Sequence, residues 1–266
     1  MQSEIDMAAL LRFYLDAGVT ETIGEEPVNR YQLAAQQPLS SESPSVCPTP
    51  TVKTNHLKPA AQNAPIPTLA EGVREAQELA LNCENLEALR QTIENFEHCS
   101  LKKLASHTVF AEGTPGAKLM IIDRQPSSDE DRSGLPFSGS AGQLLDKMLA
   151  AIGLERDEVY LASAIPWRPP GGRTPTDEER ALCLPFALRH IELAKPTCVL
   201  ACGEAAGHLL DRKTGINKLR GKWNDLQIGE VRAKMLPTFH PAFLIDQPGA
   251  KKLAWADLLS LKAEME

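Results

Sequence analysis

Residues 118–123 read KLMIID, a short run of large apolar side chains that ends in a carboxylate. Such a run, bounded by polar loops, is typical of a strand that is buried on both faces of a parallel sheet. Three later segments repeat the pattern, and each is followed by a loop and a helical stretch: 159–165, 197–202 and 234–238. Strands that alternate with helices predict an α/β fold whose parallel sheet is covered by helices on both faces.

The segments around these strands have helical patterns. Thr176, with Glu179 three residues later, forms a capping box and predicts a helix from Thr176 to Leu193. A short helix is expected to open at Gly203. Further helices are predicted at 141–152 and 249–263, and as two pieces over 69–98 that break near Asn82–Asn85.

The N-terminal part of the chain differs in composition from the rest. Residues 3–18 carry apolar residues mostly three or four apart, which predicts a short amphipathic helix. Residues 37–68 are rich in Pro, Ser and Thr and have too few large apolar side chains to offset the entropy of ordering. We therefore expect a helical segment over 1–32, a flexible linker over 33–68 and one α/β domain over 69–266.

The 266 residues include 42% hydrophobic and 24% charged residues, which excludes a wholly disordered or fibrous protein. The net charge is −7, and residues 1–100 contribute −8 of it, with 6 basic and 14 acidic residues. Bulk charge therefore gives no support for a nucleic-acid partner, although a local basic patch is compatible with one. No apolar run approaches the roughly 20 residues of a membrane span. The six cysteines, with no export signal before them, predict reduced thiols in the cytoplasm.

Two loops that follow predicted strands carry candidate binding residues. In the loop over 123–142, Phe137 stands between Pro136 and Gly139. It is a candidate stacking platform for a planar ligand, although an aromatic residue in such a position is more commonly a core side chain. In the loop over 167–175, Arg168 and Arg173 flank a Pro-Pro-Gly-Gly turn. Their guanidinium groups suit phosphate oxygens, and a solvated surface turn explains them equally well.

A third loop follows the last predicted strand. His240 precedes Pro241, which restricts its backbone to extended geometry and directs the imidazole outward. A lone histidine is more often structural than catalytic. Phe243 and Leu244 are apolar residues in this loop. They are either core residues or a wedge that enters between bases.

Three blocks resemble, in order and spacing, motifs of the uracil-DNA glycosylase superfamily, most closely its family 4, the iron–sulfur enzymes. They are GLPFSGSAGQLLDKMLAAIGL (134–154), VYLASAIPWRPPGGRTPTDEE (159–179) and TFHPAFLIDQP (238–248). The resemblance covers residues 99–262 and implies a three-layer α/β/α sandwich with a four-stranded parallel sheet. It also implies a pocket for a flipped base at the strand ends. Phe137 is then expected to stack on the base, His240 to lie on the leaving-group side, and the loop from Pro241 to enter the minor groove.

The chain departs from the family in its first two motifs. Where the family has Gly-Glu-Ala-Pro-Gly, this chain has Asp123-Arg124-Gln125-Pro126-Ser127, so that a cation replaces the glutamate. Ser163 replaces the asparagine that reads the uracil edge. We expect Gln125 to orient a water and Asp123 to be the nearest carboxylate, with His240 donating to the departing base.

The cluster ligands of family 4 are also incomplete. Cys99 and Cys183 match two of the four cysteines, whereas Phe96 and Trp167 occupy the other two positions. Two thiolates do not satisfy a four-cysteine cluster. We therefore expect no metal and no cofactor.

These observations lead to three hypotheses. The first is a DNA-repair glycosylase that hydrolyses the N-glycosidic bond of uracil or a related deaminated base, with weakened or altered activity. The second is an inactive DNA-binding relative in which Arg124, Arg168 and Arg173 hold the backbone. The third is an interaction adaptor that works through residues 1–68. For the first, the expected partner is single- or double-stranded uracil-containing DNA, and the protein is expected to be a cytoplasmic monomer without a membrane partner.

Overall fold

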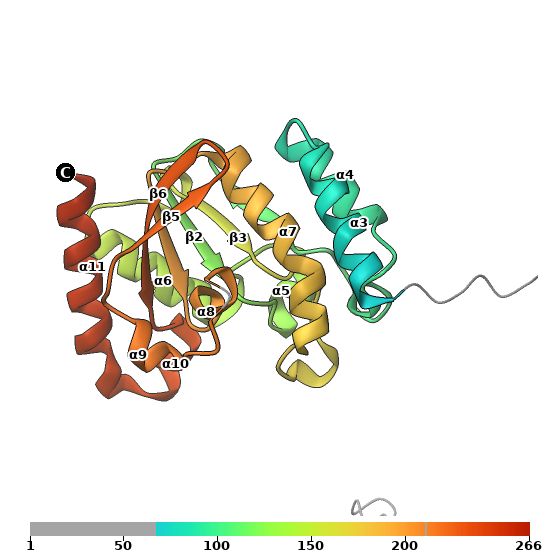
Figure 1. Ribbon diagram of the computed structural model, residues 1–266. Helices are drawn as coiled ribbons and strands as arrows, with labels where there is room; N and C mark the ends of the chain where they lie inside the picture. Colours follow the sequence, from blue (N-terminus) through green and yellow to red (C-terminus); the bar gives the residue numbers. More distant parts are fainter. Residues whose placement is uncertain (1–67, 211) are drawn as a thin grey trace, which may run out of the picture. The chain divides into compact units, whose positions relative to one another are not determined.

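The computed structural model describes residues 68–210 and 212–266 (Figure 1). The helix predicted over 3–18 and nearly all of the predicted linker lie outside these residues. The first described helix, α3, begins at Leu69, and the side chain of Thr68 caps it by accepting a hydrogen bond from the backbone of Glu71. Among the described residues, no helix has the length and apolar character needed to span a membrane.

The described residues form one mixed sheet of six strands in the order β1-β3-β2-β4-β6-β5. The four inner strands are parallel, as predicted, and β1 and β5 pair antiparallel at the two edges. The four-strand prediction therefore misses both edge strands. Neither has a buried apolar run, because β1 has three residues and β5 buries only one. The strands are β1 (Ala111–Gly113), β2 (Leu119–Asp123), β3 (Tyr160–Ser163), β4 (Cys198–Cys202), β5 (Asn224–Ile228) and β6 (Val231–Thr238).

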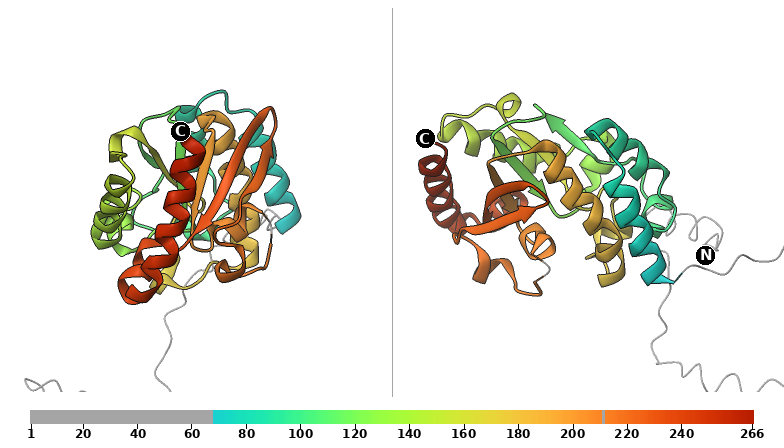
Figure 2. Two further views of the ribbon diagram at one scale, coloured as in Figure 1. Left: turned by 90° about the vertical axis from the view of Figure 1, so that its left-hand side faces the viewer. Right: turned by 45° about the horizontal axis from the view of Figure 1, so that its top comes forward.

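Helices cover both faces of the sheet, which confirms the predicted three-layer sandwich (Figures 1 and 2). Even-numbered residues of β2, such as Met120, pack with α7, and odd-numbered residues, such as Leu119, pack with α6 and α11. Helices α3 and α4 pack in turn against α7. The α-helices are α3 (Leu69–Leu81), α4 (Leu86–Asn95), α5 (Ser128–Ser133), α6 (Gly139–Ala151), α7 (Asp177–Ala194), α8 (Ala205–Leu209), α9 (Ile216–Leu219), α10 (Pro241–Asp246) and α11 (Lys251–Met265).

Among the described residues, the predicted helices occur close to their expected positions. The capping box of Thr176 and Glu179 begins α7, and the break over 82–85 separates α3 from α4. Two short helices lie where the sequence predicted loops, namely α5 after β2 and α10 after β6. Each has six residues, which is too short for a helical period to be recognised in the sequence. Both helices lie at the edge of the sheet where the parallel strands end.

Candidate active site

A cavity of about 570 Å³ lies at the carboxyl ends of the parallel strands. Asp123, Arg124 and Gln125 reach it from the end of β2, Glu204 from the turn after β4, and His240 from the end of β6. Ligands of parallel α/β sheets bind at this edge, because the loops that follow the strands meet there. The structure therefore brings together residues that are more than a hundred positions apart in sequence.

The imidazole of His240 faces the carboxylate of Asp123. Nε2 of His240 is 3.3 Å from Oδ1 of Asp123, a contact that lacks the alignment of a regular hydrogen bond. Nδ1 accepts a hydrogen bond of 3.1 Å from the backbone N–H of Ala242, so the proton of the neutral ring is carried by Nε2. Burial favours the neutral ring, but the charges of Asp123 and Glu130 outweigh it and raise the pKa of His240.

The ring of Phe137 stacks on the imidazole of His240. Their centroids are 5.8 Å apart and their planes differ by 17°. Phe137 is 1% exposed and is not among the residues that line the cavity. A base that stacks between two rings requires the rings to be about 7 Å apart, since each stacked contact takes about 3.5 Å. Access of a base to the face of Phe137 therefore requires the imidazole to move.

Phe137 has a left-handed backbone with φ of 51°, which is a strained conformation for a residue with a bulky side chain. Its N–H donates to the carboxylate of Glu130. Arg156 donates to the carbonyl oxygens of Pro136 at 3.0 Å and of Phe137 at 3.3 Å. A Cβ atom at Gly142 would overlap the carbonyl oxygen of Phe137, so a glycine is required there. These contacts hold the turn in place.

Glu130 is a site residue that the sequence reasoning missed. Its carboxylate is buried and accepts hydrogen bonds from the backbone N–H groups of Ser127 and Phe137. Burial and the neighbouring charge of Asp123 raise the pKa of Glu130. The Ser127/Glu130 spacing is that of a capping box, and that pattern was the available sequence evidence for both α5 and this carboxylate.

Arg124, at the position of the family's glutamate, forms an ion pair with Glu204. The pair joins the end of β2 to the turn after β4 at the mouth of the cavity. Burial lowers the pKa of Arg124, and the charge of Asp123 opposes this effect. The sequence pattern does not single out Glu204. Its pairing role depends on the adjacency of β2 and β4.

Several polar atoms around the cavity are buried and, among the described residues, have no hydrogen-bond partner. They are Nε of Arg124, Oε1 of Gln125, Nε of Arg168 and Oγ of Ser163. Ser163 lies beside Asp123 in the register of β2 and β3, whereas the other three residues line the cavity. Buried polar groups are almost always satisfied by protein, water or ligand. The group is therefore suited to a polar ligand or to bound water.

The predicted DNA-binding residues differ in their exposure and in their contacts. Phe243 is 42% exposed and lines the cavity. Leu244 is buried against Phe239 and Ala254, so the prediction of an exposed wedge is wrong for Leu244. Pro241 is also buried, as the first residue of α10.

Arg173 lies outside the cavity lining and forms a two-pronged pair with Glu179 at 2.7 and 2.8 Å, which occupies much of its donor capacity.

The residues at the expected cluster position do not fit a four-thiolate iron–sulfur cluster. Cys99 and Cys183 share one buried group with Phe96 and Trp167, and both aromatic side chains are buried there. The indole of Trp167 donates to the hydroxyl of Thr108 at 3.1 Å, so the ring is held as a core residue. In the described part of the chain, no group of three or more His, Cys, Asp or Glu side chains is arranged to hold a metal ion.

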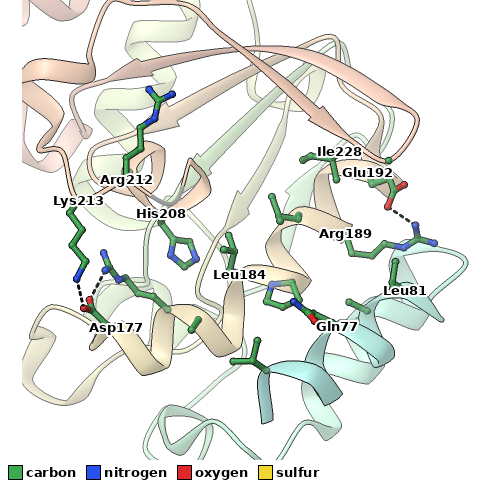
Figure 3. A pocket seen from close by; sticks show the side chains of 18 residues that line it. Gln77, Leu81, Asp177, Leu184, Arg189, Glu192, His208, Arg212, Lys213 and Ile228 are labelled. Atoms are coloured by element: carbon green, nitrogen blue, oxygen red, sulfur yellow. Dashed lines mark hydrogen bonds and ion pairs between the residues drawn. The ribbon is translucent and has the colours of Figure 1, made fainter. Parts of the chain in front are cut away.

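A larger hollow of about 700 Å³ lies elsewhere, among α3, α7, α8 and the hairpin of β5 and β6 (Figure 3). Most of its charged groups pair with one another, as Lys213 does with Asp177 and Arg189 with Glu192. None of the predicted site residues lines it. The candidate active site is therefore the smaller cavity.

Comparisons with known proteins identify the family of this chain. Residues 110–259 match the model of the Uracil DNA glycosylase superfamily. The Type-4 uracil-DNA glycosylase of Sulfurisphaera tokodaii is 31% identical over 185 residues, covering 67% of this chain and 84% of that protein. The Type-4 enzyme of Thermotoga maritima is 35% identical over 164 residues, covering 61% of this chain and 84% of that protein. Both the match and the α/β/α fold support the predicted family, and the chain belongs to the uracil DNA glycosylase superfamily.

Proposed function

We propose that this protein is a DNA-repair glycosylase that hydrolyses the N-glycosidic bond of uracil or a related deaminated base flipped out of DNA. The observation that carries the proposal is the cavity at the strand ends, where Asp123, His240 and the unsatisfied polar atoms of Gln125 and Arg124 converge. The Type-4 relatives, which are named for this activity, support it. We also propose that the protein acts as a cytoplasmic monomer without a cofactor.

The reaction breaks the bond between C1′ and the base nitrogen, and the bonding electrons leave with the base. His240 Nε2–H donates to the developing base anion, and the carboxylate of Asp123 stabilises the positive sugar. Nε2 of Gln125 donates a hydrogen bond of 3.0 Å to the carbonyl oxygen of Arg173. This contact fixes the amide and leaves Oε1 to accept a hydrogen bond from the attacking water. The water oxygen bonds to C1′, and its proton passes to Asp123.

Base recognition in this proposal uses Phe137 and Ser163. A base that stacks on Phe137 displaces the imidazole from the ring face, and the neighbouring Ser163 hydroxyl offers one hydrogen bond at the end of β3. A hydroxyl has its donor and its acceptors on one atom, whereas a side-chain amide presents them on two separate atoms that can pair with two adjacent groups of the base. Discrimination between uracil and cytosine is therefore expected to be weaker than in enzymes that have the asparagine.

Formation of abasic sites on single- and double-stranded uracil oligonucleotides tests the proposal. We expect product from the unmodified protein and a loss of at least about a hundred-fold for His240→Ala, since removal of one hydrogen-bond donor to a developing anion has an effect of this size. His98→Ala is the matched control, because His98 pairs with Glu75 of α3, away from the cavity. Absence of product from uracil and from every other deaminated base refutes the proposal.

The Arg124 substitution favours a second candidate, an inactive relative that binds DNA. A partly buried guanidinium at the cavity opposes the positive charge that develops on the sugar during cleavage, and the charges of Glu204 and Asp123 reduce this effect. Salt-sensitive DNA binding without any abasic product is the expected result for this candidate. In that case Arg124, Arg168 and Arg173 hold phosphates.

A further inference from the structure

A second hollow, of about 260 Å³, shares a wall with the candidate active site. Helix α10 forms this wall, because Phe243 lines the active-site cavity whereas the next residue, Leu244, lines the hollow. The remaining walls come from α6 and α11, and they are mostly apolar. We call this hollow, with the exposed residues at its rim, the α10–α11 surface. Apart from Leu244, none of the predicted site residues lines it.

Trp255 of α11 lines this surface and is 42% exposed. The other two tryptophans donate hydrogen bonds within the protein. Trp167, which is buried, donates to Thr108, and Trp223, which is partly buried, donates to Ser260. An exposed indole beside an apolar hollow is a stacking platform for a planar ligand. Trp255 is therefore the most exposed of the three tryptophans.

Three lysines surround the indole. Lys147 and Lys251 line the hollow and Lys252 follows in the first turn of α11, all of them exposed. Within the described residues none of the three has an ion-pair partner, unlike Lys213 and Lys234, which pair with carboxylates. Unpaired ammonium groups around an aromatic face are complementary to a ligand that carries both planar rings and negative charge.

We infer that the α10–α11 surface binds an unpaired base and the adjoining phosphates of a DNA strand, beside the nucleotide held in the active site. The inference rests on the proposed function, because the shared wall of α10 places this surface next to the cavity for the flipped base. Aromatic stacking combined with a basic rim is the general mode of binding to single-stranded nucleic acid. It predicts a preference for single-stranded over fully paired DNA.

Quenching of tryptophan fluorescence by a thymine oligonucleotide without uracil tests the surface independently of catalysis. We expect quenching in the unmodified protein and its loss in Trp255→Phe, because Trp167 is buried and Trp223 lies outside the lining of the hollow. Affinity is expected to fall about 5- to 150-fold in Trp255→Ala, the range measured for removal of one stacking side chain. Trp255→Phe keeps a ring and retains most of the affinity.

Two controls separate stacking from general effects. Leu259→Ala removes an exposed apolar side chain of the same helix outside the hollow and leaves the affinity unchanged. Lys251→Gln reduces the slope of log affinity against log salt by about 0.7, the value for one phosphate contact on single-stranded DNA. Lys262→Gln changes the same charge outside the hollow and does not alter the slope.

The outcomes distinguish this inference from the proposed function. If the protein forms abasic sites but Trp255→Ala binds single-stranded DNA as the unmodified protein does, the α10–α11 surface is not a DNA site, and a protein segment is its alternative occupant. If Trp255-dependent binding occurs without any abasic product, the inference holds and the proposed activity is wrong. Equal affinity of single- and double-stranded DNA for the unmodified protein also overturns the inference.

Discussion

The imidazole of His240 lies parallel to the ring of Phe137, with 5.8 Å between their centroids. The two residues come from the end of β6 and from the turn before α6, and the sheet edge brings them together. In this arrangement the imidazole occupies space that a stacked base requires. Binding of a base and the position of the proposed acid are therefore coupled.

This coupling predicts opposite effects of His240→Ala on binding and on turnover. Removal of the imidazole exposes Phe137, so DNA containing a non-hydrolysable uracil nucleotide is expected to bind as tightly as before, or more tightly. Turnover is expected to fall about 10²- to 10³-fold, because the proposed hydrogen-bond donor to the base anion is lost. Binding titration and single-turnover kinetics measure the two effects. A parallel loss of affinity and turnover contradicts the coupling.

The left-handed backbone of Phe137 predicts an unusual order of stability. Phe137→Ala is expected to lower the free energy of unfolding by about 3–5 kcal/mol, because a buried ring is lost. Glycine normally destabilises more than alanine, but it adopts a φ of 51° without strain. Phe137→Gly is therefore expected to be at least as stable as Phe137→Ala in urea denaturation. A markedly less stable glycine variant shows that the turn is not strained.

Arg156 is expected to act as a positioning residue for Phe137. It donates to the carbonyl oxygens of Pro136 and Phe137 and also pairs with Glu112 at 2.7 Å. Arg156→Gln is expected to lower kcat roughly ten- to a hundred-fold, since small displacements of binding groups have effects of this size.

Glu112→Gln is the matched control for this prediction, because it weakens the same ion pair and leaves the contacts to Pro136 and Phe137. Its kcat is expected to stay near that of the unmodified enzyme. Equal losses in the two variants indicate that Arg156 acts only through stability. Arg156→Lys, which keeps the charge without the two-pronged geometry, is expected to lie between them.

The raised pKa of His240 predicts a specific pH dependence. A group whose pKa is higher in the folded protein than in the unfolded chain stabilises the fold fully below the unfolded value, here about 6.5. This stabilisation is lost as the pH rises through the raised pKa of the folded state. The stability difference between the unmodified protein and His240→Gln, followed by urea denaturation, is expected to shrink above about pH 6.5. A difference that grows with pH excludes a raised pKa.

The buried aromatic residues beside Cys99 and Cys183 predict that this protein does not take up an iron–sulfur cluster. Reconstitution with iron and sulfide under anaerobic conditions is expected to leave the purified protein without cluster absorbance or stoichiometric iron. The double variant Phe96→Cys/Trp167→Cys supplies four thiols in this group and is the comparison sample. Stoichiometric cluster in the unmodified protein contradicts the prediction.

The sequence by itself determined the parallel core of this fold. The apolar runs that became β2 and β4 are buried along their whole length, and a strand that is covered on both faces needs such a run. The capping box of Thr176 and Glu179 similarly marked the start of α7. Edge strands β1 and β5 left no such pattern, because their side chains are mostly accessible to solvent.

For the site, the sequence located Asp123, Phe137 and His240 on loops after strands, and the resemblance suggested their roles. Only the tertiary structure showed that Phe137 is covered by His240, that Glu130 holds its backbone and that Glu204 pairs with Arg124. The physical reason is that burial patterns are local and repeat along the chain, whereas contacts at the strand ends depend on strand order and register. Those are set by the packing of the whole sheet.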